Sequence, residues 1–392
     1  MNVATLDQNP NTELGKATLL AMAAASGIAV ANIYYSQPML GFIEAEFPGQ
    51  SATDLISTST QLGYALGLFL LLPLGDLVHR RRLIIGQFVI LAVALSFAAV
   101  SQSAWMLVAG SFLVGASSTV AQQIVPFAAS LAPAEKRGAT IGTVTAGVLS
   151  GILFGRALSG LVGEYSGWRE MFWIAVPMAL TAALMMFLTL PDHAPVSRMA
   201  YRDAIKSLAH LWKGKPSLRT AAVVQASLFA SFTAFWTVLS LYLEGPDFGL
   251  GADVAGLFGI IGAVGLFAAP IAGKAADKRG PHFVVWVGAM LTLLSWVIFG
   301  IGASIVALAI GVIVLIFGIQ SALVSNQHII YALEPEARSR LNTIFMTGMF
   351  LGGAAGSALA LAAWTYGSWN AVTVVGGVLP VAALAIKAIR AS

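Results

Sequence analysis

The chain has 392 residues, of which 58% are apolar and 10% are charged. An average soluble domain carries about 25% charged residues, so this composition predicts an integral membrane protein. The absence of cysteine excludes disulfides and thiolate chemistry. The net charge of +4 comes from short basic connections between apolar stretches, which gives no support to a nucleic-acid-binding function.

Apolar stretches long enough, or nearly long enough, to cross a membrane as helices follow one another along the chain, since a span needs about 20 mostly apolar residues. They lie at 17–42, 55–75, 83–101, 104–130, 138–162, 168–190, 219–243, 253–273, 282–302, 304–331, 339–365 and 368–388. We therefore expect an all-α membrane protein with twelve transmembrane helices. Residues 1–16 are polar and predict a tail with no cleavable secretory signal.

The two halves of the chain resemble each other at an offset of 201 residues. The repeated positions are Asp76 and Asp277, Tyr165 and Tyr366, Trp168 and Trp369, and the glycine series Gly147, Gly151, Gly155 and Gly348, Gly352, Gly356. Internal repeats are common in membrane transporters. The repeat predicts two pseudo-symmetric six-helix bundles, an N-terminal one at 17–190 and a C-terminal one at 219–388, joined by a linker at 191–218.

Basic residues predict the orientation. All Lys and Arg residues except Arg156 and Arg169 lie in the terminal segments or in every second connection. By the positive-inside bias, both termini and the 191–218 linker are expected to be cytoplasmic, in a multi-pass protein of a bacterial inner membrane. Within the linker, Ile205, Leu208 and Trp212 recur at helical spacing, which predicts an amphipathic helix on the inner leaflet.

This arrangement resembles the major facilitator superfamily over residues 17–388. Its most specific element is the loop signature G-x-x-x-D-(R/K)-x-G-(R/K) after spans 2 and 8. The second half matches it with Gly273, Asp277, Lys278 and Gly280, whereas the first half retains Asp76, Arg80 and Arg81 but lacks both glycines. The resemblance implies that these loops lock the cytoplasmic side.

In such a lock, each loop carboxylate faces the N-terminus of a helix in the other half, where the helix dipole stabilises negative charge. The expected helices begin near Arg340 for Asp76 and near Gly138 for Asp277.

The glycine-rich span 5 is similar to that of the 12-span drug:proton antiporter branch, the multidrug and arabinose-efflux-like proteins, although the Gly-Pro pair of that branch is missing. Spans 2 and 8 carry small residues, namely Gly63, Gly67, Gly259 and Gly262. In the superfamily these spans meet across the interface between the halves. The resemblance further implies a monomer that uses a proton gradient and no cofactor.

Spans 1, 4, 7 and 10 line the central cavity of this fold, which identifies candidate substrate contacts. They are Asn32, Tyr34, Tyr35, Gln37, Gln122, Gln123, Phe232, Phe235, Trp236, Gln320, Asn326 and Gln327, together with Arg156 in span 5. Amides and aromatic rings dominate this set. Such a lining favours a neutral or amphipathic organic molecule held by stacking and a few hydrogen bonds.

Arg156 is the charge that lies inside a predicted span, and a buried Arg requires a cavity or an acidic partner. Glu44, Glu46 and Asp54, near the outer ends of spans 1 and 2, are the expected partners and the first candidates for proton coupling. His328 in span 10 is the second candidate. An outward-reaching Arg or a fixed structural pair is the alternative for Arg156.

The chain shows no Ser/His/Asp constellation, metal-ligand spacing or Walker loop, which disfavours an enzyme, a metal site or an ATP-driven pump. The leading hypothesis is a secondary transporter that exports hydrophobic or amphipathic compounds by proton antiport and alternating access. Its rival is a proton-coupled carrier of a small organic anion anchored by Arg156. A third hypothesis is a receptor or scaffold that retains the fold without transport.

Overall fold

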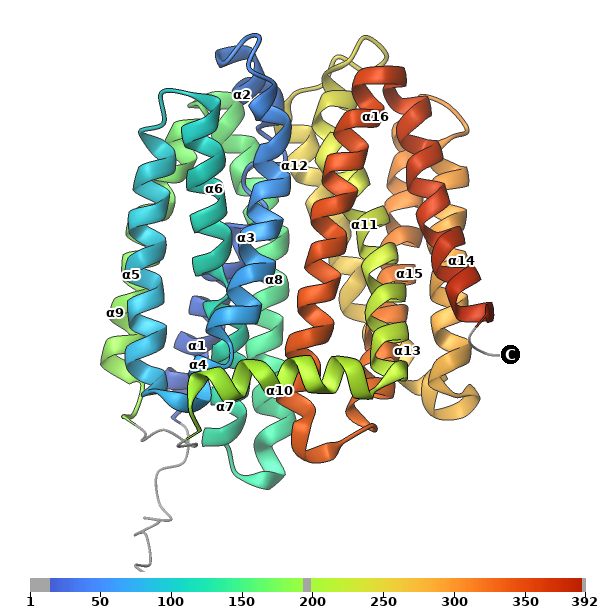
Figure 1. The fold of residues 1–392 in the computed structure, drawn as a ribbon. Helices are drawn as coiled ribbons and strands as arrows, with labels where there is room; N and C mark the ends of the chain where they lie inside the picture. Colours follow the sequence, from blue (N-terminus) through green and yellow to red (C-terminus); the bar gives the residue numbers. More distant parts are fainter. Residues whose placement is uncertain (1–14, 193–198, 390–392) are drawn as a thin grey trace, which may run out of the picture.

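The computed structural model describes residues 15–192 and 199–389, in which every regular element is a helix. The long helices stand side by side in two groups, and one short helix lies across one end of both (Figure 1). The first half contains α1 (Lys16–Ala31), α2 (Leu40–Glu46), η1 (Ser51–Leu55), α3 (Ile56–Leu71), α4 (Leu74–Leu77), α5 (Arg80–Ala99), α6 (Ala104–Ser118), α7 (Val120–Leu131), η2 (Ala134–Lys136), α8 (Arg137–Tyr165) and α9 (Trp168–Thr189). The second contains α10 (Tyr201–Gly214), α11 (Pro216–Glu244), α12 (Ala252–Ile261), η3 (Gly262–Val264), α13 (Gly265–Arg279), α14 (Pro281–Phe299), α15 (Ile305–Tyr331), η4 (Pro335–Ala337) and α16 (Arg338–Ile389).

Ten helical stretches of the described ranges are long and apolar enough to cross a membrane. The last of them, α16, contains two predicted spans, because Gly367 and Ser368 leave the helical conformation at its bend. The first predicted span is divided into α1 and α2 by the irregular residues 32–39. These two features reconcile the ten stretches with the twelve spans expected from the sequence.

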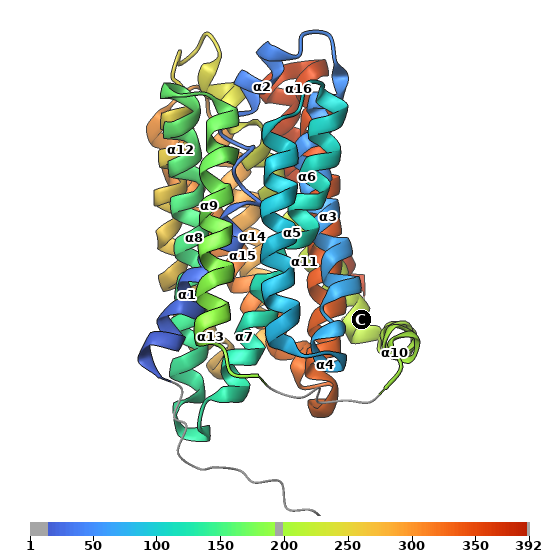
Figure 2. The same cartoon turned by 90° about the vertical axis from the view of Figure 1, so that its left-hand side faces the viewer.

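The two ends of the bundle differ in charge. Helix α1 begins and α16 ends at the end where α10 lies, as Figures 1 and 2 show. Helices that start with Arg80, Arg137 and Arg338 also begin there, so we call it the basic end. The opposite end, which carries α2 and the bend of α16, is called the far end.

Helix α10 is the amphipathic helix expected in the linker. Leu208 and Leu211 are buried, and the helix contacts α11 and α16. The Tyr201 hydroxyl donates a hydrogen bond to the Leu70 carbonyl of α3, at 2.9 Å. Helix α10 therefore packs on α11 and α16 and is hydrogen-bonded to α3 of the first half. The predicted tail at 1–16 lies almost entirely outside the described residues, as do linker residues 193–198.

Glycines let α8 approach the first helix of its own half. A Cβ built on Gly151 would lie 2.6 Å from the Cα of Gly27 in α1, and Gly147 and Gly155 lie against Ala23 and Ala31. Only glycine permits such contact between two backbones.

The same contact occurs in the second half, where Gly348, Gly352 and Gly356 of α16 lie against α11. A Cβ on Gly352 would lie 2.6 Å from the Cα of Ala226. The glycine series that recurs in the sequence is therefore one helix-packing motif, present in both halves.

The small residues expected between the halves divide into two groups. Gly63 and Gly67 of α3 pack on α6 in their own half, although α3 itself contacts α16 across the interface. Gly259 and Gly262 face the other half, where they lie against Arg156 and Leu153 of α8. The interface between the halves thus involves the pair α8 and α12 and the pair α3 and α16.

Candidate substrate cavity

A cavity of about 850 Å³ lies between the two halves. Along α8 its wall runs from Ile141, near the basic end, to Arg156, and on α11 it ends at Trp236. Asp76 and Arg338 line it at the basic end. The cavity therefore begins at the basic end and stops partway through the bundle, at the level of Arg156.

Contacts between the halves close the far end. Ser240 Oγ of α11 donates to the Gln37 carbonyl at 3.2 Å, and the Ala252 N–H of α12 donates to Glu164 Oε2 of α8 at 3.0 Å. Nearby, a Cβ on Gly160 would lie 3.0 Å from the Cα of Gly256. The structure is thus closed at the far end.

Arg156 stands at the closed head of the cavity, where it is 2% exposed. Its guanidinium carbon lies 4.1 Å from the ring centroid of Tyr34 and 4.1 Å from that of Trp236. Its Nε donates to Gln37 Oε1 at 3.1 Å, whereas Nη2 is buried without a hydrogen-bond partner. An intramembrane Arg costs about 2.5–3.5 kcal/mol on insertion scales, and stacking between two rings offsets part of that cost.

Of the two alternatives expected for Arg156, a cavity or an acidic partner, the structure shows the cavity, and no carboxylate of the described residues pairs with Arg156. Glu46 instead pairs with Arg169 and accepts a hydrogen bond from Trp168 Nε1 at 2.6 Å. Glu44 and Asp54 lie near each other at the far end, and no ion pair joins either to Arg156 in the described residues. The irregular segment 32–39 lies between the cavity head and α2. Glu44 and Glu46 of α2 are therefore placed away from Arg156.

Burial raises the pKa of Glu44 to about 7, and the nearby negative charge of Asp54 adds to the effect. Glu44 is therefore a group that changes charge near neutral pH. His328 is exposed on α15 and does not line the cavity.

The structure brings most of the predicted contact residues to the cavity. Those that line it are Tyr34, Gln122, Gln123, Arg156, Phe232, Trp236, Gln320 and Gln327. Gln123 also donates to the Leu71 carbonyl at 3.2 Å and to Gln87 Oε1 at 2.7 Å, which ties α7 to α3 and α5. Its side chain is therefore fixed by the protein itself.

The other predicted contacts do not line the cavity, and each has a local reason. Asn32 donates to the Ile28 carbonyl at 2.6 Å, at the end of α1. Gln37 lies behind Arg156, to which it is hydrogen-bonded. Tyr35 is 1% exposed inside the first half.

Two mispredicted residues belong to the core of the second half. Phe235 stacks on Phe299 with ring centroids 4.4 Å apart, in a cluster that includes Trp296 and Trp369. Asn326 donates to Gln225 Oε1 at 3.1 Å. Both side chains stabilise packing between helices.

Sequence reasoning missed an apolar wall made by α3, α11 and α16. Tyr64 lies 4.2 Å from Phe350, and Phe229 lies 5.2 Å from Phe350, measured between ring centroids. Met346 and Met349 continue this wall along α16. Spans 2 and 11 are not among those predicted to contact substrate, although their aromatic residues are visible in the sequence.

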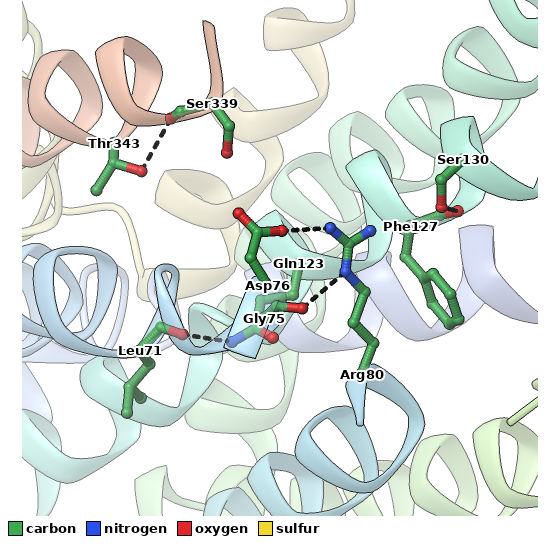
Figure 3. A network of polar contacts seen from close by, with 9 residues as sticks. All are labelled: Leu71, Gly75, Asp76, Arg80, Gln123, Phe127, Ser130, Ser339 and Thr343. Atoms are coloured by element: carbon green, nitrogen blue, oxygen red, sulfur yellow. Dashed lines mark hydrogen bonds and ion pairs between the residues drawn. The ribbon is translucent and has the colours of Figure 1, made fainter. Parts of the chain in front are cut away.

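Within residues 15–192 and 199–389, no hydrogen bond or ion pair joins the lock loops across the halves. Arg80 donates to Asp76 at 2.5 Å and to the Gly75 carbonyl at 2.8 Å, with Ser339 of α16 facing this network (Figure 3). Asp76 and Ser339 both line the cavity at its basic end, and no hydrogen bond or ion pair joins these two described residues.

The remaining lock residues are placed as follows. Arg81 donates to the Phe187 carbonyl of α9 at 2.6 Å, within its own half. In the described part of the chain no hydrogen bond or ion pair joins Asp277 to α8. Lys278 lies in the last turn of α13, and Gly280, with φ of 84°, permits the turn into α14. A Cβ added to Gly273 would meet no atom within 4 Å, so this glycine faces open space.

Two repeated helical halves around a central cavity define a membrane transporter. The sequence profile of the Major Facilitator Superfamily matches residues 19–333, and the chain belongs to this family. Members of the family are transporters and not enzymes, and they bind small-molecule substrates within the membrane.

Similar proteins agree with this assignment. The chain is 39% identical to the uncharacterized transporter YgaY of Escherichia coli O157:H7 over 372 residues, which is 94% of each chain. It is 32% identical to the probable transporter SCO4007 of Streptomyces coelicolor, over 98% of this chain and 90% of that one. A multi-drug resistance efflux pump PmrA homolog of Lactococcus lactis is 25% identical over 73% of each chain.

Solved structures show the same fold. The crystal structure of a bacterial homolog to the human lysosomal transporter Spinster, inward-facing and unoccupied, superposes with a TM-score of 0.77. The identity is 14%, and the match covers 94% of this chain and 95% of that one. Bacterial relatives and many apolar helices identify a multi-pass inner-membrane protein.

Proposed function

We propose that this protein is a proton-driven exporter of amphipathic organic compounds. The observation that carries the proposal is the cavity of about 850 Å³, whose walls are mostly apolar and aromatic with a few amides. Pockets for drug-sized ligands span about 300–1,000 Å³ and have this composition. The similarity to an efflux pump homolog supports export as the direction.

In the proposed cycle, the basic end faces the cytoplasm, as the distribution of Lys and Arg favours. A compound enters the cavity there, and the halves then rock so that the far end opens. The α8–α12 contact at Gly160 and Gly256 must separate in this step. Asp76 and the start of α16 must approach each other, which closes the cavity behind the compound.

Proton coupling is placed at the far end in this proposal. Among the described residues that line the cavity, Asp76 is the only carboxylate, and it is paired with Arg80. In the described part of the chain no cation forms an ion pair with Glu44, and burial raises its pKa to about 7. We therefore assign proton binding to Glu44, which lies on the side from which protons would enter, with Asp54 and, from the other half, Glu244 as its acidic neighbours.

The test is transport in proteoliposomes with an imposed proton gradient and a pH-sensitive dye. Addition of an amphipathic substrate is expected to cause proton movement opposite to substrate movement in the wild type. Glu44→Gln is expected to retain substrate binding and to lose proton movement, with Glu336→Gln at an exposed position of η4 as the matched control. Substrate flux that ignores the gradient in the wild type would refute proton coupling.

A further inference from the structure

We infer that the transported compound is an amphipathic monoanion whose carboxylate binds Arg156 and whose apolar body lies along the aromatic wall. This inference rests on the proposed transport function and names its substrate class. It goes beyond an anchor for a small anion, because the cavity provides space and apolar surface for a much larger molecule.

The charge of Arg156 is not compensated by the protein. Buried charges are normally paired or coordinated, since an isolated ion is poorly solvated there. Arg156 contacts an amide and two aromatic rings, and Nη2 has no partner. In the described residues no carboxylate forms an ion pair with it. The missing negative charge is therefore expected to come from the ligand.

The donors at the cavity head have a geometry that suits a carboxylate. Stacking between Tyr34 and Trp236 leaves the in-plane N–H groups of the guanidinium for hydrogen bonding. The Trp236 indole N–H is also buried without a partner. Two donors from opposite halves thus lie together at the cavity head, and a carboxylate with two oxygens can accept from both.

Arg156 is the one cation at the head of the cavity among the described residues, since Arg80 and Arg338 line it at the basic end, and this favours one negative charge on the ligand group bound at the head. One guanidinium neutralises one such charge, so a dianion would leave excess charge in a poorly hydrated place. An organic cation would be repelled by Arg156, and the carboxylate of Asp76 lies at the opposite end of the cavity beside Arg80. The site therefore favours a monoanion.

The wall below Arg156 suits an apolar body. Tyr64, Phe229 and Phe350 form a continuous set of ring contacts, and Met346 and Met349 extend it toward the basic end. Aromatic rings and flexible methionines accommodate apolar groups of varied shape. An aryl or alkyl body attached to the carboxylate would cover this surface.

The test is equilibrium binding to the purified protein in nanodiscs without any gradient. The probes are three compounds with one naphthyl body, ending in a carboxylate, a primary amide or an ammonium group. The wild type is expected to bind the carboxylate at least about 10-fold more tightly than the amide, as hydrogen bonds to a charged group imply. The ammonium compound is expected to bind most weakly.

Variants test which residues produce the preference for the carboxylate over the amide. Arg156→Gln is expected to make carboxylate and amide equal, Arg156→Lys to restore part of the preference, and Trp236→Phe to reduce it while retaining the ring. Arg202→Gln, at an exposed site on α10, is the control and is expected to match the wild type. Elution of each variant as a single species in size exclusion shows that it is folded.

The outcomes separate this inference from the proposed function. Equal binding of the three probes to the wild type, or a carboxylate preference that survives Arg156→Gln, overturns the inference. Carboxylate-selective binding without proton-linked flux would sustain it while the proposed proton-driven export fails. Proton-linked flux of neutral compounds without this selectivity would leave export standing and overturn the inference.

Discussion

Substitution of Gly160 by alanine tests whether the α8–α12 contact holds the far end closed. The added Cβ would lie 3.0 Å from the Cα of Gly256 and closer still to the carbonyl oxygen of Ala252. Both neighbours are backbone atoms, which cannot rotate out of the way. The two helices belong to different halves, so the overlap exists only while the far end is closed.

The expected size of the effect follows from this difference between states. Overpacking by one methyl group costs about 1–3 kcal/mol, and here the cost falls on the far-end-closed state alone. That energy corresponds to a shift of about 5–150-fold in the equilibrium toward the far-end-open state. Gly142→Ala on the same helix is the matched control, because a Cβ there meets nothing within 4 Å.

The assay is a distance measurement by pulsed electron paramagnetic resonance. The chain contains no cysteine, so Ala45→Cys and Pro246→Cys can each carry a spin label at exposed far-end positions of the two halves. Gly160→Ala is expected to add a population with a longer distance that the control lacks. Identical distance distributions in Gly160→Ala and Gly142→Ala would refute the reasoning.

Three further predictions follow from individual contacts. Gly151→Ala is expected to destabilise the protein by about 1–3 kcal/mol relative to Gly142→Ala, because the added Cβ would overlap with the α1 backbone. The measurement is the thermal unfolding temperature of both variants in detergent, which should be lower for Gly151→Ala. Burial raises the pKa of Glu44 to about 7 in the far-end-closed state, so that state binds the proton more tightly. Lowering the pH from about 7 toward the ordinary pKa of a glutamate should therefore favour the closed state, and the spin-label distances should report this. Glu44→Gln should reduce the pH dependence, and the part that remains should come from Glu244, whose pKa burial also raises to about 7. Trp296→Phe removes the indole N–H that donates to Ser231 Oγ at 2.6 Å and should destabilise the protein by about 1–3 kcal/mol, while Trp105→Phe at an exposed site should have no comparable effect on thermal unfolding.

The spans were predictable because the membrane imposes them, and the repeat because matching residues recur at an offset of 201. Hydrocarbon cannot satisfy an open backbone N–H or C=O, so every span must be a long apolar helix that hydropathy reveals. The break at 32–39 was not predictable in the same way. The segment contains the polar residues Asn32 and Gln37 and the helix breaker Pro38, but the contacts that satisfy its backbone, such as that from Ser240 to the Gln37 carbonyl, are known only from the fold.

The cavity residues were predictable in part, and adjacent pairs show the limit. Tyr34 lines the cavity but Tyr35 does not, and Trp236 and Gln327 line it whereas Phe235 and Asn326 do not. Consecutive residues of a helix point about 100° apart, so the rotation of each helix decides which one faces the cavity. Helices that are apolar on all sides give no periodic signal from which to read that rotation.

The arrangement at the cavity head also bears on how substrate and proton would be coupled. Gln37 accepts a hydrogen bond from Arg156 through its side chain and from Ser240 through its backbone carbonyl. Glu44 lies a few residues further along the chain, beyond the break between α1 and α2. A ligand carboxylate that draws Arg156 toward itself would weaken the hydrogen bond from Arg156 to Gln37. It would thereby loosen the irregular segment whose Gln37 carbonyl accepts from Ser240. On the proposed mechanism, substrate and proton need not share a site, because each acts on one end of the same irregular segment between the cavity and the far-end closure.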